Sequence, residues 1–242
     1  MNANLSKLEA QNVKTTQSTQ PAILFDLDGT LVDTAYEHVR AWSAALQSAR
    51  IVVPDWKIHR RIGMSGQSLL RQVLRETDAG KRKINLKALE KKHDTAFSAS
   101  PRKIRLLPGA QELLDYLSGQ GVSWAIATTG NKQQAQRLLK HLSLPKNAVV
   151  VTGDDVAQAK PSPDIFLAAA ERLSVPMENC VVVGDSVWDM LAAGRRRALG
   201  VGFLAGGYSK EELEQSGAFR VYSDAADMLV HIEDLGIPGR KS

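Results

Sequence analysis

The chain has 242 residues, 43% of them hydrophobic and 24% charged, which is typical of an ordinary globular protein with one large or two smaller domains. Its single cysteine, Cys180, excludes an internal disulfide, which fits a reducing cytosol, and we expect it to be a buried, inert thiol. No apolar run is long enough to span a bilayer, and residues 1–20 lack the apolar core of a secretory signal. We therefore expect a cytoplasmic protein without a membrane partner and with a disordered tail over residues 1–20.

The net charge of +5 is unevenly distributed along the chain. Residues 34–105 contain 16 Lys and Arg against 6 Asp and Glu, whereas the remainder contains 15 against 20. Nucleic-acid binding is one interpretation, but the basic residues are not interleaved with aromatic ones and no nucleic-acid-binding motif is present. We favour a segment that attracts small anionic substrates and expect no nucleic-acid partner, although many of these side chains would simply solvate helix faces.

In chain order, the first predicted element is a strand over residues 22–25, whose four apolar side chains are typical of a strand buried on both faces. Asp26 and Asp28 follow directly, and Gly29 and Thr30 form a turn. Residues i and i+2 of an extended chain point the same way, so the two carboxylates would face one small space. They would repel each other there unless a cation or a proton intervenes. A strand that ends in a plain Asp-Gly turn is the alternative interpretation.

Residues 34–105 show helical periodicity and no convincing strand. Their apolar spacing, with breaks at Pro54 and Gly63, predicts four helices. These lie near residues 36–50, 55–62, from 69 to near 78–80, and 84–98. This segment is therefore predicted to be an all-helical insert within a larger domain.

From residue 107 onward, strands and helices alternate. Strands are predicted over 122–127, 148–151, 180–183 and 199–203, with a last one ending near 221. Helices are predicted over 109–118, 133–142, 164–173, 187–195 and 225–235, with a short helix capped by Ser209 and its capping-box partner Glu212. These repeated units imply an α/β fold with a doubly wound parallel sheet. We predict two domains, an α/β core of residues 21–33 and 106–242 and a helical domain of residues 34–105.

Polar residues follow apolar strands at several points, and open α/β sheets bind ligands beyond the carboxyl ends of their strands. Thr128 follows the second predicted strand, Lys160 lies after the third, and Asp185 and Asp189 follow the fourth. These residue types suit phosphoryl transfer, in which catalysis is mostly positioning and charge neutralisation. Asp26 and Asp185 would hold Mg²⁺, while Thr128 and Lys160 would bind phosphate. Taken singly, each could instead be a strand-end hydroxyl, a solvated lysine or a helix cap.

The sequence F-D-L-D-G-T-L-V-D that contains Asp26 and Asp28 resembles the signature of the haloacid dehalogenase-like (HAD) superfamily, in its phosphatase branch. The resemblance covers almost everything after residue 20, with a helical cap in the place of the insert and a Rossmann-like core. It implies that Asp26 is a nucleophile that forms an aspartyl-phosphate. It also implies that Asp28 is the general acid and base and lends its backbone carbonyl to the metal.

The same resemblance assigns roles to the remaining polar residues. Asp189 would bind the metal through water or hold Lys160. Thr129 and Gly130 would add backbone N–H groups to the phosphate-binding loop that begins at Thr128.

The activity implied by the resemblance is Mg²⁺-dependent hydrolysis of a small phosphate monoester, similar to that of phosphoglycolate phosphatases, under a closing cap. The expected partner is a small phosphorylated metabolite, and the expected assembly is a monomer or homodimer. Arg60, Arg61, Gly63 and Ser65 are candidates for substrate contact in the cap, unless the turn at these residues merely joins two helices.

Three other functions are considered. A phosphomutase of the β-phosphoglucomutase type would share this pattern and would need a bisphosphate activator. A dehalogenase would have no use for Asp28 or for the acidic Asp185 site. A non-catalytic binding protein on the same fold would be expected to have lost Asp26, Asp28, Lys160 or Asp185, all of which are present.

Overall fold

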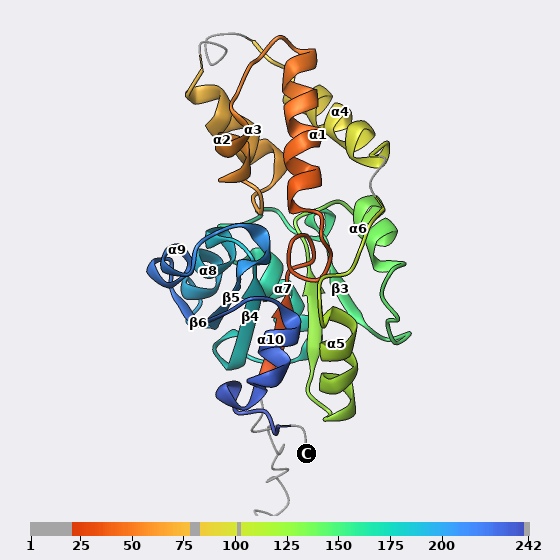
Figure 1. Cartoon of the computed structure of the whole chain (residues 1–242), viewed down its shortest axis with the longest axis vertical. Helices are drawn as coiled ribbons and strands as arrows, with labels where there is room; N and C mark the ends of the chain where they lie inside the picture. The colour runs from red at the N-terminus through yellow and green to blue at the C-terminus, as the bar shows by residue number, and fades with distance from the viewer. Residues whose placement is uncertain (1–20, 78–82, 101–102, 240–242) are drawn as a thin grey trace, which may run out of the picture.

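The computed structural model describes residues 21–77, 83–100 and 103–239, so the tail predicted over residues 1–20 lies outside the described part (Figure 1). A parallel six-stranded sheet lies at its centre, with the strands in the order β3-β2-β1-β4-β5-β6. The strands are β1 (Ala22–Phe25), β2 (Trp124–Ala127), β3 (Val149–Val151), β4 (Cys180–Gly184), β5 (Leu199–Phe203) and β6 (Ala218–Tyr222). This is the order of a doubly wound sheet, and the predicted fold class is confirmed.

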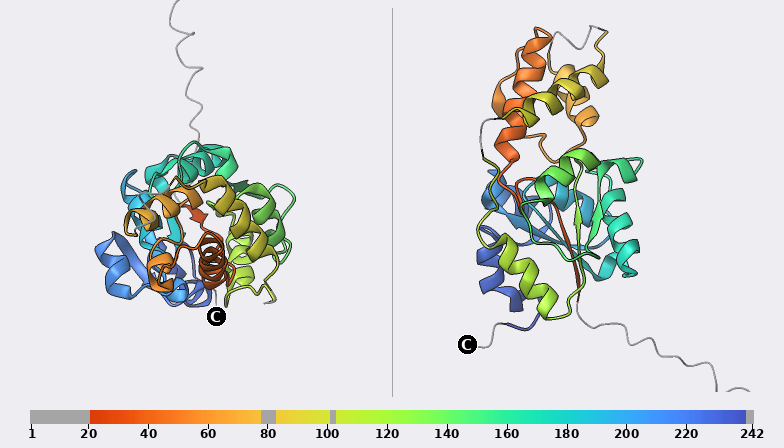
Figure 2. Two further views of the ribbon diagram at one scale, coloured as in Figure 1. Left: turned by 90° about the horizontal axis from the view of Figure 1, so that it is seen from above. Right: turned by 90° about the vertical axis from the view of Figure 1, so that its right-hand side faces the viewer.

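Helices cover both faces of the sheet (Figure 2). Alternate residues of β1 point to opposite faces, with Ile23 in one apolar cluster and Leu24 in the other. The Ile23 cluster includes α5 (Ala110–Gly119), α6 (Lys132–Leu139) and α10 (Ala225–Val230), and the Leu24 cluster includes α7 (Asp164–Leu173) and α8 (Val187–Gly194). The short helix α9 (Lys210–Gln215) packs beside α8 and β6. Cys180 is buried at the start of β4, and burial raises its thiol pKa to about 11, as expected for an inert thiol.

Four helices form a separate layer at one end of the sheet (Figure 1). They are α1 (Ala35–Ser48), α2 (Asp55–His59), α3 (Gly66–Arg75) and α4 (Leu86–Ser98), and the described residues of 34–105 contain no strand. Their apolar faces meet in a cluster of their own that includes Trp42, Leu70 and Leu89. This separate cluster supports the predicted division into a core and a cap, which stays a prediction. Among the described helices, none is long and apolar enough to cross a membrane.

Several predicted helix ends differ from the observed ones. The helix predicted over residues 55–62 ends at His59, because the chain turns before Gly63, whose φ is +96°. The helix predicted to begin at residue 84 begins at Leu86, where the side chain of Asn85 accepts a hydrogen bond from the Ala88 N–H. The last helix stops at Val230 and continues only as a short 3₁₀ helix, Ile232–Leu235. The capping box predicted between Ser209 and Glu212 is confirmed.

Candidate active site

Three adjacent strands end at polar side chains. Asp26 follows β1, Thr128 follows β2 and Asp185 follows β4. Because β1 lies between the other two strands and Phe25 pairs with both of them, these side chains meet at the carboxyl edge of the sheet. All three are at most 3% exposed, so they form a buried polar centre.

Lys160 completes a buried ion-pair network with two carboxylates. Its Nζ lies 2.6 Å from Asp26 Oδ1 and 2.7 Å from Asp189 Oδ1, and its side chain is fully buried. Burial alone would lower the pKa of Lys160, but Asp189 and Asp26 raise it above its ordinary value, so the amine carries its charge. A solvated loop lysine, the alternative considered from the sequence, is excluded by this burial.

Asp26, Asp185 and Asp189 place carboxylate oxygens within 4.8 Å of one another. Burial raises the pKa of Asp26 to about 7, against the opposing charge of Lys160. Burial and the charges of Asp189 and Asp26 raise the pKa of Asp185 well above its ordinary value. When all three carboxyl groups are ionised, they and the one ammonium group leave two negative charges, which a single divalent cation would neutralise.

Two glycines allow the chain to approach the Asp185 carboxylate closely. A β-carbon on Gly206, or on Gly29 with its φ of +80°, would collide with Asp185 Oδ2. Thr30 Oγ1 donates a hydrogen bond of 3.0 Å to Asp185 Oδ1, which fixes the orientation of the carboxylate. An oxygen-only donor set of this kind fits a hard divalent cation, and its identification as Mg²⁺ stays a prediction.

Asp189 uses both of its carboxylate oxygens within the protein. Oδ1 contacts Lys160, whereas Oδ2 accepts hydrogen bonds from the Ser186 hydroxyl at 2.5 Å and from the Ser186 backbone N–H at 3.2 Å. Of the two roles considered from the sequence, this arrangement favours holding Lys160.

The Asp28 side chain points away from the carboxylate cluster. Its Oδ1 accepts a hydrogen bond from Thr34 Oγ1 at 2.6 Å and lies 2.9 Å from His38 Nε2, while Oδ2 accepts one from Thr128 Oγ1 at 3.3 Å. Burial raises the pKa of Asp28, but His38 and the two hydroxyls outweigh burial and lower it overall. Both carboxylate oxygens of Asp28 therefore have partners within the protein. Its predicted roles as general acid and base and as a metal ligand through its backbone carbonyl stay predictions.

A row of hydrogen-bonding side chains continues from Asp28 through two cap helices and back to the core. His38 Nδ1 lies 3.0 Å from His93 Nε2, and His93 Nδ1 lies 3.0 Å from Asp94 Oδ1. Asp94 in turn accepts a hydrogen bond of 2.7 Å from Gln134 Nε2 on α6. Burial lowers the pKa of His93 to about 4, so at pH 7 its neutral ring donates to Asp94 and accepts from His38. The sequence analysis did not identify this row.

The loop after β2 carries the predicted phosphate-binding groups. Thr128 Oγ1 accepts a hydrogen bond of 3.1 Å from the Gly130 N–H, which bends the loop around the hydroxyl. The Gly130 carbonyl accepts from the Gly153 N–H at 2.9 Å, which anchors the loop to its neighbour. Thr129 and Gly130 line the pocket next to Asp26, where a phosphate would lie.

A pocket of about 800 Å³ lies between the cap helices and the core. Gly63 and Ser65 line it together with Asp26 and Asp28, and the predicted contact of Gly63 and Ser65 with substrate stays a prediction. The pocket therefore connects the buried carboxylates to the turn that precedes α3.

Arg60 and Arg61 do not line this pocket, so the structure does not bring these two predicted contact residues to the site. Arg60 pairs with Glu212 on α9, and its guanidinium lies 4.7 Å from the centre of the Tyr208 ring. Arg61 pairs with Glu76 and donates a hydrogen bond of 2.6 Å to the Lys57 carbonyl. Both arginines are thus occupied by partners outside the pocket, and sequence spacing alone does not reveal these partners.

Residues 21–195 match the family model described as "haloacid dehalogenase-like hydrolase". The chain belongs to the haloacid dehalogenase-like hydrolases. This HAD hydrolase is 35% identical over 182 residues to hexitol phosphatase A of Escherichia coli (strain K12), covering 71% of this chain and 78% of that relative. It is 30% identical to a phosphoglycolate phosphatase of Xanthomonas campestris, covering 76% and 81% of the two chains. The structure of a hydrolase from Pseudomonas syringae is similar over 89% of this chain and 98% of its own, with a TM-score of 0.83 and 46% identity.

The cap of this HAD hydrolase contributes pocket residues that the sequence analysis missed. These residues lie on the pocket-facing sides of α1 and α4 and at the start of α3. They are His38, Trp42, Gln67, Ser68, Arg71, Glu90, His93 and Asp94. Helical periodicity predicts which residues share a face, but the face that looks into the pocket is decided by how the four helices pack.

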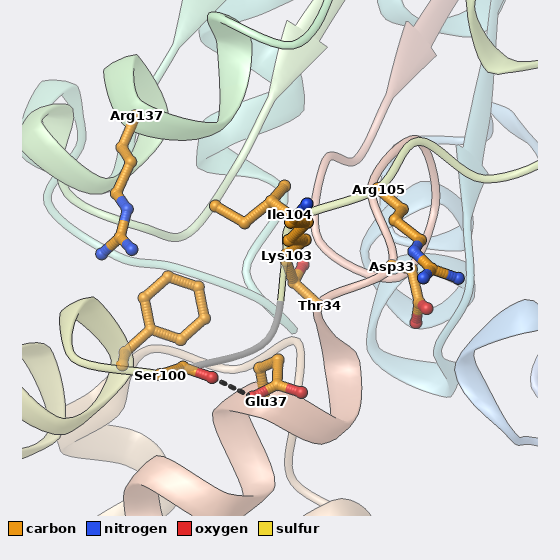
Figure 3. Close-up of a pocket in the computed structure, with 9 residues that line it drawn as sticks. Asp33, Thr34, Glu37, Ser100, Lys103, Ile104, Arg105 and Arg137 are labelled. Atoms are coloured by element: carbon orange, nitrogen blue, oxygen red, sulfur yellow. Dashed lines mark hydrogen bonds between the residues drawn. The ribbon is translucent and has the colours of Figure 1, made fainter.

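A smaller pocket of about 100 Å³ lies where the two connections between cap and core run side by side (Figure 3). Asp33 and Thr34 belong to one connection, Lys103 and Arg105 to the other, and Arg137 reaches toward them from α6. The Asp33 N–H donates a hydrogen bond of 2.9 Å to the Arg105 carbonyl, so the two connections of this HAD hydrolase are tied to each other.

Proposed function

We propose that this HAD hydrolase removes phosphate from a small phosphate monoester through an aspartyl-phosphate on Asp26, with Mg²⁺ as cofactor. The observation that carries the proposal is the buried Asp26 carboxylate, which Lys160 orients at the base of the large pocket beside two further carboxylates. Two of its relatives are named phosphatases, one for hexitol phosphates and one for phosphoglycolate, which supports this class of reaction.

In the first step, an Asp26 carboxylate oxygen attacks phosphorus and the bond from phosphorus to the alcohol oxygen breaks. The alcohol leaves with a proton from Asp28. His38 Nε2 lies 2.9 Å from Asp28 Oδ1, within hydrogen-bond distance of this acid. In the second step, water gives a proton to Asp28 and attacks the aspartyl-phosphate. The bond from phosphorus to Asp26 then breaks and inorganic phosphate is released.

The cluster of Asp26, Asp185 and Asp189 contains the residues that would hold the Mg²⁺ ion. Asp26 and Asp185 would bind it with carboxylate oxygens and Asp28 with its backbone carbonyl, while Asp189 keeps Lys160 in place. When bound, Mg²⁺ would reduce the repulsion between a carboxylate nucleophile and an anionic phosphate.

The phosphate oxygens would be bound by Thr128, Thr129 and Gly130 and by the Lys160 amine. Lys160 is positioned for this role because it already touches the nucleophile, and its charge is retained by two carboxylates. Point-charge neutralisation of this kind stabilises the charge spread over the transferred phosphoryl group.

The proposal is tested by measuring phosphate release from a panel of phosphate monoesters with Mg²⁺ and with a chelator. Mg²⁺-dependent release is expected from the wild type and from Asp115→Asn, an exposed control on α5, and none from Asp26→Asn. Activity that survives in Asp26→Asn or in the chelator would contradict the proposal. If no ester is hydrolysed, a sugar phosphate with a bisphosphate activator tests the phosphomutase alternative. Inactivity in both assays would favour a non-catalytic binding protein.

A further inference from the structure

We propose that the substrate of this enzyme is the phosphate ester of a polyhydroxy alcohol and that Glu90 determines this specificity. This inference rests on the proposed phosphatase function and concerns the part of the pocket that receives the leaving alcohol. It follows from the side chains that α1, α3 and α4 present to the pocket opposite the buried carboxylates.

Glu90 is a carboxylate that faces the pocket without an ion-pair partner among the described residues. It lies on α4 and is partly buried, and its hydrogen-bond contact is with Gln67 Nε2 at a distance of 3.5 Å. Burial raises its pKa, which shows that its surroundings supply too little solvation for the charged form. A carboxylate in this condition is a strong acceptor for hydroxyl groups that a ligand brings.

Glu90 lies beside an aromatic ring at the same point of the pocket. A β-carbon on Gly66 would lie 3.0 Å from Glu90 Oε1 and 3.0 Å from Trp42 Cη2, so both side chains close on this glycine. The Trp42 ring also stacks on the His93 ring, with centroids 4.1 Å apart, which helps to hold the indole in place. A ring edge next to a hydroxyl acceptor suits a molecule with C–H groups and hydroxyls on adjacent carbons.

The remaining wall is rich in neutral hydrogen-bonding groups and is not strongly cationic. Its neutral polar side chains include Ser65, Gln67, Ser68, Thr129, Asn131, Gln134, Gln158 and Ser162. Away from the buried carboxylates, Arg71 and Arg195 are balanced by Glu90, Asp94 and Asp154.

This balance of charges favours hydroxyls over a carboxylate in the leaving group. Arg71 already donates a hydrogen bond of 3.4 Å to Gln67 Oε1, and Gln67 in turn contacts Glu90. A carboxylate on the leaving group, as in phosphoglycolate, would meet Arg71 only next to the like charge of Glu90.

The expected loss of substrate discrimination follows from the cost of leaving polar groups of the pocket without a hydrogen-bond partner. A pocket built to bind hydroxyls discriminates strongly against ligands that lack them, because its own polar groups then lose water without gaining a partner. One charged acceptor accounts for about a 10- to 100-fold part of that discrimination.

The test compares kcat/KM for glucitol 6-phosphate, phosphoglycolate and p-nitrophenyl phosphate in the wild type, Glu90→Gln and Glu171→Gln. Glu171 is an exposed acid on α7 outside the pocket and serves as the matched control. The wild type and the control should prefer glucitol 6-phosphate to phosphoglycolate. In Glu90→Gln that ratio should fall about 10- to 100-fold, because the hydroxyl acceptor weakens and the repulsion of a carboxylate disappears.

Two outcomes would overturn the inference, namely a wild type that prefers phosphoglycolate or a ratio that is unchanged in Glu90→Gln. Mg²⁺-dependent release from p-nitrophenyl phosphate, which carries no hydroxyls on its leaving group, reports the phosphatase function separately. Failure on all three esters would therefore reject the proposed function, whereas activity with the wrong preference would reject only the role of Glu90.

Discussion

The two walls of the large pocket are built in different ways. On the core side, the pocket reaches Asp26, which belongs to an almost completely buried cluster with Asp185 and Lys160. Lys160 Nζ lies 2.6 Å from Asp26 Oδ1. On the cap side, Glu90 and Gln67 are partly exposed and touch each other only loosely, at 3.5 Å. Substitutions on the cap side should therefore cost less stability than substitutions in the buried cluster beneath the sheet's carboxyl edge.

The largest expected effect comes from removing the buried positive charge that pairs with Asp26 and Asp189. Lys160→Met should lower the free energy of unfolding by about 3–5 kcal/mol, because it leaves Asp26 and Asp189 buried without a counter-charge. It should also lower kcat about 10²- to 10³-fold. Denaturant unfolding and phosphate release would measure the two effects, with Lys140→Met on the surface as control. Adding Asp189→Asn should restore part of the lost stability, and failure to do so would contradict the charge-pair explanation.

A smaller effect, of opposite sign, is expected when the excess negative charge is reduced. In the presence of a chelator, Asp185→Asn should raise the free energy of unfolding by about 1–3 kcal/mol, because burial and the charges of Asp189 and Asp26 raise the pKa of Asp185. The same variant should lose most of the stabilisation that Mg²⁺ gives the wild type. Thermal unfolding with and without Mg²⁺ would measure both. A variant that is destabilised in chelator would show that the cluster does not carry excess charge.

The row of histidines predicts a moderate dependence of stability on pH. The pKa of His93 is about 4 in the folded protein, because burial outweighs the opposing influence of Asp94 and Asp28, and the neighbouring His38 also lowers it. The unfolded chain, with an ordinary histidine pKa of about 6.5, binds the proton first, so the wild type loses stability as pH falls from about 6.5 to 4. His93→Gln should not show this loss. The stability difference between the two proteins should shift by about 1–2 kcal/mol in favour of the variant between pH 7 and pH 5. A constant difference over this range would contradict a buried neutral His93.

The smallest effect is expected for the arginine that lies outside the pocket. Arg60→Met removes a partly exposed ion pair with Glu212 and should cost at most about 1 kcal/mol. It should leave the ratio of kcat/KM values between glucitol 6-phosphate and phosphoglycolate unchanged, because Arg60 does not line the pocket. A marked change in that ratio would show that Arg60 affects substrate binding after all.

The sequence was sufficient to predict the strands and the polar residues at their ends, because these features depend on residues that are close together along the chain. Every strand was expected within a few residues of its observed bounds, because short apolar runs that end in polar residues mark buried parallel strands. Asp26, Thr128 and Asp185 come together for the same reason, since parallel strands bring their carboxyl ends to one edge of the sheet. Their assigned roles in catalysis stay predictions.

Side-chain contacts between residues that are distant in sequence were not predicted. Arg60 and Arg61 lie next to the turn that lines the pocket, but Glu212 and Glu76 draw their side chains elsewhere. His38 and His93 are 55 residues apart, and neither lies in a pattern that indicates their hydrogen bond. Such contacts arise from helix packing, which fixes the rotation of each helix about its axis and leaves no periodic signal in the sequence.

The two connections between the helical insert and the α/β part, near residues 33–34 and 103–105, lie side by side, which has a consequence for deleting the insert. Val32 and Leu106 form an antiparallel bridge, and the Leu107 N–H donates a hydrogen bond of 3.0 Å to the Leu31 carbonyl. The points at which the chain leaves and re-enters the α/β part are therefore neighbours, separated by no more than the spacing of two strands. A short turn from residue 33 to residue 105 would close this gap, so deleting the helical insert should leave the order and register of the sheet intact.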